Sequence, residues 1–145
     1  MVKVLFDTSV LIAAFVSNHP QHQPCLIWLK KVKDKTIEGV IGTHTLAETY
    51  SVLTRLPITP AISANLAQRL ITENLADFAI ISLNDRDYFQ VIELLVNLNL
   101  TGGAIYDALI ARSAINSSVN LILTLNPSHF QRLGEPVSSK VEVPK

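Results

Sequence analysis

Three acidic residues in separate parts of the chain, Asp7, Glu48 and Asp107, are the clearest candidates for chemistry. Apolar residues surround Asp7 at positions 4–6 and 10–12, and Asp107 at positions 105 and 108–110, which favours side chains that point into one shared, partly buried site. Two carboxylates about 4 Å apart repel by roughly 4 kcal/mol at an effective dielectric constant of about 20. Three converging carboxylates therefore need protons or a bound cation to balance their charge.

The ligand types indicate which cation such a site would hold. Carboxylate oxygens with few histidines or thiols favour Mg²⁺ or Mn²⁺ over Zn²⁺, and Mg²⁺ usually keeps waters that can react. The expected reaction is the hydrolysis of a phosphodiester. Asp7 and Asp107 are expected to be direct ligands, while Glu48 either binds the metal or orients the attacking water as a general base.

Each acid on its own also has an ordinary structural explanation. Asp7 suits a turn or a helix N-cap, and Glu48 suits a solvated helix position. Asp107 suits the first turn of a helix, where a negative charge is favourable by about 0.3 to 1 kcal/mol. The sequence predicts a catalytic site only when the three acids are taken together.

Alternating strands and helices must position these acids. The expected strands are residues 2–6, 39–42, 78–82 and 119–124, with a further edge strand at 141–143. The expected helices begin near residues 8 and 26, run from a Thr43 or Thr45 cap to about residue 56, and cover residues 61–74, 85–98 and 105–116. This alternation predicts an α/β fold, with a mostly parallel central sheet flanked by helices on both faces. Ligands bind outside the carboxyl ends of such strands, where Asp7 and Asn126 both lie.

Length and composition predict one domain over residues 1–145, with a polar tail at about 134–145. Lysines and arginines number 12, as do aspartates and glutamates, so no overall charge attracts nucleic acid and any RNA contact must be local. A mean hydropathy of +0.32 indicates apolar surface that meets a partner. Cys25 is expected to be a small buried hydrophobe in a reducing compartment. No segment has the roughly 20 apolar residues of a membrane span, so the protein is expected to be soluble and cytoplasmic.

Four segments together resemble the PIN-domain family, in particular the VapC-like toxins of bacterial toxin–antitoxin pairs. They are DTSVLIAAF from Asp7, HTLAETYSVLTRL from His44, GGAIYDALIARSA from Gly102 and LTLNPSHF from Leu123. The resemblance implies that Asp7, Glu48 and Asp107 are the acidic metal-binding residues. It makes Asn126 a fourth position, where the family commonly has Asp, and it makes Ser9 and Thr124 the accompanying hydroxyls.

The resemblance also implies a function. The chain is expected to be a divalent-metal-dependent endoribonuclease with Mg²⁺ or Mn²⁺ as cofactor, leaving a 5′-phosphate and a 3′-hydroxyl. It is expected to act as the toxin of a toxin–antitoxin pair, with a cognate antitoxin and a homodimeric state. The neutral amide of Asn126 should weaken metal binding on its side of the site. The alternative is a catalytically weakened PIN-like module that binds RNA or a protein partner without cleavage.

Several other residues have two open readings. Arg55 and Arg112 lie on the helices of Glu48 and Asp107, and they either contact RNA or antitoxin or form structural salt bridges. Four lysines at positions 30, 31, 33 and 35 form a basic face beside Trp28. This basic face either contacts RNA phosphate or is simply solvated. The four histidines lack a metal-binding spacing and are expected at the surface or at helix caps. A phosphatase would need an acid where Ser9 stands, and the glycine pattern of a dinucleotide binder is missing.

Overall fold

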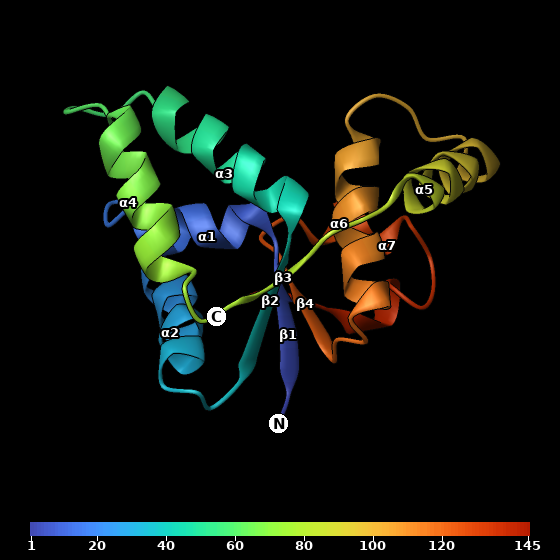
Figure 1. Cartoon of the computed structure of the whole chain (residues 1–145), viewed down its shortest axis with the longest axis horizontal. Coiled ribbons are helices and arrows are strands. Elements are labelled where there is room, and N and C mark those ends of the chain that lie inside the picture. Colours follow the sequence, from blue (N-terminus) through green and yellow to red (C-terminus); the bar gives the residue numbers. More distant parts are fainter.

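A computed structural model describes all 145 residues as one five-stranded sheet with helices on both sides (Figure 1). The strands are β1 (Lys3–Phe6), β2 (Glu38–Gly42), β3 (Ala79–Ile81), β4 (Leu121–Leu123) and β5 (Val141–Glu142). The helices are α1 (Thr8–Phe15), α2 (His22–Lys33), α3 (Thr43–Arg55), α4 (Ala64–Asn74), α5 (Asp85–Leu98), α6 (Ala104–Asn116) and α7 (Pro127–Gln131), followed by a short 3-10 turn at Ser138–Lys140. The expected α/β fold with helices on both faces is confirmed.

Every strand pair is parallel, and the strand order is β3-β2-β1-β4-β5. The chain therefore extends the sheet in one direction from β1 to β3 and then returns to place β4 on the other side of β1. The point where the strand order reverses lies between β1 and β4. Parallel sheets of this kind bind ligands beyond the carboxyl ends of the strands at that reversal, and Asp7 and Thr124 directly follow these two strands.

Alternation along the strands divides the core between the two faces of the sheet. Leu5, Val40 and Ile122 pack with residues of α5, α6 and α7. Their neighbours Val4 and Ile41 face the other way and pack with residues of α1 and α2. Figure 1 shows α1 to α4 on one side of the sheet and α5 to α7 on the other. The burial of both faces explains why the strands are nearly continuous apolar runs.

A close approach of α6 to the end of β2 fixes the height of α6 above the sheet. A Cβ atom on Gly42 would lie 2.7 Å from the Ser113 hydroxyl oxygen of α6, closer than real Cβ contacts allow. The glycine thus lets α6 rest against the carboxyl end of β2. Asp107 lies on the same helix, in its first turn.

The element boundaries differ from the sequence predictions in a few places. The helix expected over residues 61–74 begins only at Ala64, because Ser63 caps it through a hydrogen bond to the Leu66 N–H. The predicted threonine cap of α3 is wrong, since Gly42 occupies the cap position and the Thr45 hydroxyl is buried without a partner. The predicted edge strand forms as β5 beside β4. None of the helices combines the length and apolar character needed to cross a membrane.

Candidate active site

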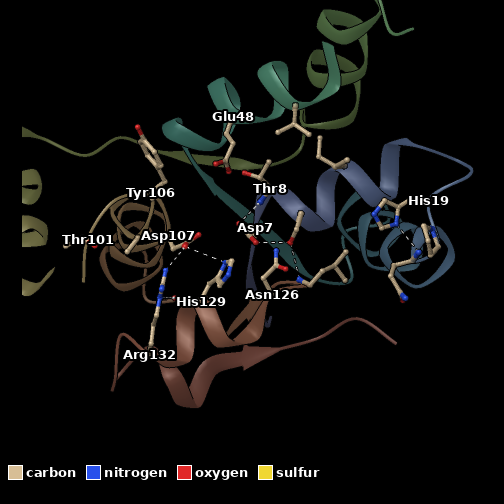
Figure 2. A pocket seen from close by; sticks show the side chains of 18 residues that line it. Asp7, Thr8, His19, Glu48, Thr101, Tyr106, Asp107, Asn126, His129 and Arg132 are labelled. Atoms are coloured by element: carbon tan, nitrogen blue, oxygen red, sulfur yellow. Dashed lines mark hydrogen bonds and ion pairs between the residues drawn. The ribbon is translucent and has the colours of Figure 1, made fainter. Parts of the chain in front are cut away.

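A pocket of about 840 Å³ lies beyond the carboxyl ends of β1 and β4. Asp7, Glu48, Asp107 and Asn126 all line it, although they come from four different elements or junctions. Figure 2 shows Asp7 at the centre, Glu48 reaching in from α3 and Asp107 from α6. The structure therefore brings together the four residues that the sequence analysis selected.

Asp7 is held rigidly at the base of the pocket. Its backbone N–H donates to the Leu123 carbonyl of β4 at 2.9 Å. Oδ1 accepts the Thr8 N–H at 2.8 Å, and Oδ2 accepts the hydroxyls of Ser9 and Thr124, each at 2.8 Å. Because a carboxylate oxygen has two lone pairs, Oδ2 is fully engaged and Oδ1 keeps one lone pair for a ligand. Asp7 is thus both the N-cap of α1 and a pocket residue.

The two hydroxyls also join Asp7 to the segment after β4. The Ser9 hydroxyl oxygen accepts the Leu125 N–H at 3.0 Å, and that of Thr124 accepts the Asn126 N–H at 3.0 Å. Each hydroxyl therefore donates to the carboxylate and accepts from the chain that leads into α7. Ser9 and Thr124, the two hydroxyl residues expected to accompany the acids, therefore contact Asp7 directly.

The electrostatics of the pocket favour a cation at Asp7. Burial raises the pKa of the Asp7 carboxyl, the hydrogen bonds from Ser9 and Thr124 partly offset this, and the charges of Asp107 and Glu48 raise the pKa further. Only 5% of Asp7 is exposed to solvent. A buried carboxylate that repels its neighbours is most stable when protonated or when a positive charge lies beside it.

Asp107 has two basic partners that the sequence analysis did not select, His129 in α7 and Arg132 at its C-cap. Arg132 Nη2 lies 3.4 Å and His129 Nδ1 3.7 Å from Asp107 Oδ2. Burial raises the pKa of the Asp107 carboxyl, while His129 and Arg132 act in the opposite direction and Glu48 raises it. The helical spacing of Asn126, His129 and Arg132 in the sequence was the available signal, because three-residue steps place side chains on one face.

Glu48 enters the pocket from the second turn of α3, which begins at Thr43. His44, one turn earlier, has its Nε2 atom 3.9 Å from Glu48 Oε2. That ring nitrogen is buried and has no hydrogen-bond partner. Glu48 is about one-third exposed, so its carboxylate is the most accessible of the three to solvent and to a substrate.

The donor set suits a hard divalent cation that keeps much of its water. The pocket offers carboxylate oxygens and the side chain of Asn126, which caps α7 without a side-chain hydrogen bond. No three His, Cys, Asp or Glu side chains lie close enough together to enclose a metal ion on their own. Mg²⁺ is commonly held through one or two carboxylates, with water and substrate phosphate completing the shell. The side chains present therefore fit such an ion.

The remaining nominated residues lie outside the pocket. Arg112 donates to Asp87 Oδ1 at 2.9 Å and also contacts Gln90, so it forms the salt bridge that was the alternative to an RNA contact. Arg55 donates to Ser51 in the last turn of α3. Lys30, Lys31 and Lys33 lie in the last turn of α2, and with Lys35 they precede the start of β2, at the opposite end of the strands from the pocket. His19, by contrast, lines the pocket at the end away from Arg132 (Figure 2).

Comparison with known proteins finds a family and close relatives. A family model described as the PIN domain matches residues 4–136. The chain is 38% identical over 115 residues to Ribonuclease VapC27 of Mycobacterium tuberculosis, covering 79% of each chain. It is 33% identical over 117 residues to Ribonuclease VapC40 of the same organism, covering 80% of this chain and 81% of the relative.

Solved structures share the fold at lower sequence identity. A structure described as VapBC2 from Rickettsia felis bound to a DNA fragment from their promoter has a TM-score of 0.70 at 20% identity, covering 99% of this chain and 100% of the other. Mycobacterium tuberculosis VapC20, described as a Sarcin-Ricin loop cleaving toxin, has a TM-score of 0.65 at 16% identity, covering 82% of this chain and 86% of the other. These likenesses confirm the arrangement of strands and helices.

Proposed function

Because the chain belongs to the PIN-domain family, we propose that it is a divalent-metal-dependent endoribonuclease, formed by residues 1–145 as one nuclease domain. The observation that carries the proposal is that Asp7, Glu48 and Asp107 come together in one pocket at the reversal of the strand order. The relatives named as ribonucleases support RNA as the substrate. The reaction is hydrolysis of a phosphodiester bond.

The three acids have separate roles in this proposal. Mg²⁺ or Mn²⁺ bound at the site would supply an acidified water and stabilise charge that develops on the phosphate. Asp7, through its free Oδ1 lone pair, and Asp107 would hold the metal, and Asn126 would add a neutral oxygen. Glu48, the most accessible acid, either completes the ligand set or accepts the proton of the attacking water.

Two basic residues at the end of α7 have a second role in the proposal. His129 and Arg132 lie beside Asp107 and face the same pocket. An arginine guanidinium matches the geometry of phosphate oxygens as well as that of carboxylates. Arg132 would therefore hold Asp107 in place before RNA binds and contact a substrate phosphate afterwards.

We further propose that this nuclease is the toxin of a toxin–antitoxin pair that acts in the cytoplasm. Solved relatives include complexes described as VapBC2, FitAB bound to a DNA fragment, and VapBC-1. The exposed apolar residues of α5, which include Phe89 and Val96 at 71% exposure each, offer surface for a homodimer or an antitoxin peptide. A monomer by light scattering at high protein concentration would remove the dimer from this proposal.

The experiment compares purified wild-type protein with the Asp7→Asn variant on labelled RNA. Wild type is expected to cleave the RNA with Mg²⁺ or Mn²⁺ but not with EDTA, and Asp7→Asn is expected to lose cleavage by about 100-fold or more. Asp77→Asn, the same change at an exposed residue away from the pocket, is the matched control. Equal cleavage by wild type and Asp7→Asn would overturn the site.

The second candidate function, a PIN-like module that binds RNA or a protein without cleaving, has one observation in its favour. The fourth position is the neutral Asn126, and no three of the acidic or imidazole groups enclose a metal site. Tight RNA binding by wild type without any Mg²⁺- or Mn²⁺-dependent product would favour this function over hydrolysis.

A further inference from the structure

Tyr106 is a large aromatic residue left half-exposed at the pocket, directly before Asp107. Its side chain lines the pocket, and 49% of the residue is open to solvent. Figure 2 shows Tyr106 at the margin of the pocket on the side away from His19, with its side chain directed toward α3. Burial of an aromatic ring is normally favourable, by roughly 1.5 to 3 kcal/mol for a fully buried apolar side chain. An aromatic ring that stays open beside three acids therefore calls for an explanation.

His44 holds the Tyr106 ring in a fixed orientation. The two rings stack with their centroids 4.9 Å apart and their planes within 1° of parallel. The stack joins α3 to α6 across the pocket, because His44 lies in the first turn of one helix and Tyr106 in the first turn of the other. One face of the Tyr106 ring is thus covered by His44. With 49% of the residue exposed, part of Tyr106 stays accessible to solvent beside this stack.

The same histidine fixes the ring relative to the catalytic groups. His44 Nε2 is buried, has no hydrogen-bond partner and lies 3.9 Å from Glu48 Oε2. Tyr106 is also the neighbour of Asp107 in the first turn of α6. The partly exposed ring is therefore held close to two of the three acids: to Glu48 through His44, and to Asp107 as its neighbour in the chain.

We propose that Tyr106, backed by His44, is a stacking platform for an unpaired nucleobase next to the phosphodiester that is cleaved. The inference rests on the proposed function and names the substrate feature that the same site selects. An open aromatic face binds any base by stacking. A base in a regular duplex has both faces covered by its neighbours, so only an unstacked base in a loop, bulge or single strand can use the platform.

The chemistry of the pocket favours a nucleobase over a peptide side chain at this position. Tyr106 shares its pocket with the carboxylates of Glu48 and Asp107, which attract a metal ion and, through it, a phosphate. A nucleotide joins a phosphate to a flat aromatic base in one unit. The juxtaposed acids and ring match those two parts, whereas the acids alone would explain the binding of any cationic segment.

The experiment measures binding of a short labelled single-stranded RNA by fluorescence anisotropy in Mg²⁺. The protein carries Asp7→Asn so that the RNA stays intact. Adding Tyr106→Leu is expected to raise Kd about fivefold to a hundredfold, because base–aromatic stacking contributes about 1 to 3 kcal/mol per base. Tyr106→Phe, which keeps the ring, is expected to recover most of the lost affinity.

A matched control and an abasic substrate separate stacking from a structural effect. Tyr50→Leu changes a tyrosine of similar exposure, 43%, that lines a different pocket on the α4 side of α3, and Kd should stay the same. An RNA that lacks the base at the stacking position should bind weakly to the Asp7→Asn protein. Adding Tyr106→Leu should not weaken the binding of this abasic RNA any further. A loss of the same size on abasic and intact RNA would overturn the platform. An unchanged Kd of Tyr106→Leu for intact RNA would overturn it too. The same holds if Tyr106→Leu weakens the binding of an antitoxin peptide but not that of RNA.

The outcomes also separate this inference from the proposed function. Metal-dependent cleavage whose KM is unaffected by Tyr106→Leu would leave the nuclease standing and overturn the platform. Binding that depends on both Tyr106 and the base, in a wild-type protein that never cleaves, would support the platform and overturn the nuclease. Cleavage by wild type with a raised KM and a nearly unchanged kcat in Tyr106→Leu would support both.

Discussion

The Thr124 hydroxyl donates a 2.8 Å hydrogen bond to Asp7 Oδ2, although 117 positions separate the two residues in the chain. They meet because β1 and β4 are parallel neighbours, with Phe6 paired to Leu123 at their carboxyl ends. The hydrogen bond lowers the pKa of a carboxyl that burial raises. One contact between the two strand ends thus helps keep Asp7 ionised for its proposed role as a metal ligand.

Replacing Thr124 by valine tests this contact. Thr124→Val keeps the shape of the buried side chain but removes the hydroxyl, so the free energy of unfolding should fall by about 1 kcal/mol. The pKa of Asp7 should rise, and RNA cleavage should fall. Thr72→Val, which removes an exposed hydroxyl that bonds only its own helix α4, is the control for urea denaturation and for activity. Equal activity in both variants would contradict the role given to Thr124.

Asp7 itself should destabilise the metal-free protein. Its pKa is higher in the folded state than in the unfolded chain, mainly through burial. The folded state then binds more protons between those two pKa values, so the free energy of unfolding falls as pH rises through that window and stays low above it. Asp7→Asn should be more stable than wild type at pH 7 in EDTA, with the difference shrinking near pH 3. A variant that is less stable at pH 7, by urea denaturation, would contradict the unfavourable burial of the Asp7 charge.

The neutral side chain of Asn126 should limit the affinity of the site for Mg²⁺. Asn126→Asp would add a fourth negative charge, and it should lower the Mg²⁺ concentration needed for half-maximal thermal stabilisation and for half-maximal cleavage. Asn65→Asp makes the same change at an exposed position of α4, outside the pocket. The two variants should separate clearly in a thermal-shift titration with Mg²⁺. Identical titrations would remove Asn126 from the ligand set.

Arg132 should control the acid limb of the pH–rate profile. Burial raises the pKa of the Asp107 carboxyl, and the His129 imidazole and the Arg132 guanidinium partly offset that rise. Arg132→Ala should therefore raise the pKa of Asp107, protonate it at higher pH and shift the acid limb of kcat/KM upward in pH. Arg69→Ala, which removes an exposed arginine paired with Glu73 on α4, should leave the profile in place. A downward shift, or no shift, would contradict this electrostatic role.

Arg112 should affect stability and leave RNA binding unchanged. It bonds Asp87, which also forms the capping box of α5 with Asn84. Arg112→Ala should lower the unfolding midpoint, because a partly buried carboxylate loses its charged partner. The Kd for RNA, measured well below that midpoint, should match wild type. A weakened Kd without any change in the midpoint would restore the RNA contact that the sequence left open.

The fold class and the set of three acids could be predicted from the sequence, because both depend on short-range patterns. Apolar strand runs before Asp7 and Asn126 predict the carboxyl ends of parallel strands, and the rule for such sheets then places the two residues together. The boundaries of α4 and the cap of α3 were missed, because a serine cap at Ser63 and a glycine cap at Gly42 depend on how the chain enters each helix.

The partners of the acids could not be predicted in the same way. The contacts of Asp107 with His129 and Arg132, and the stack of His44 on Tyr106, join helices that are far apart in sequence. They depend on how α3, α6 and α7 are placed over the strand ends. Arg112 shows the reverse case, since its location on the helix of Asp107 indicated a site residue, whereas its direction on that helix places it against Asp87.

The central claim is that the acids act as one unit on RNA. The most direct test is the rate of RNA cleavage in Mg²⁺ by Asp7→Asn, by Asp107→Asn and by the double variant, all compared with wild type. Groups that act together are non-additive, so the account predicts that each single variant loses about 100-fold or more and that the double variant is little slower than either one. Losses that multiply in the double variant, or a single variant that cleaves as fast as wild type, would contradict it.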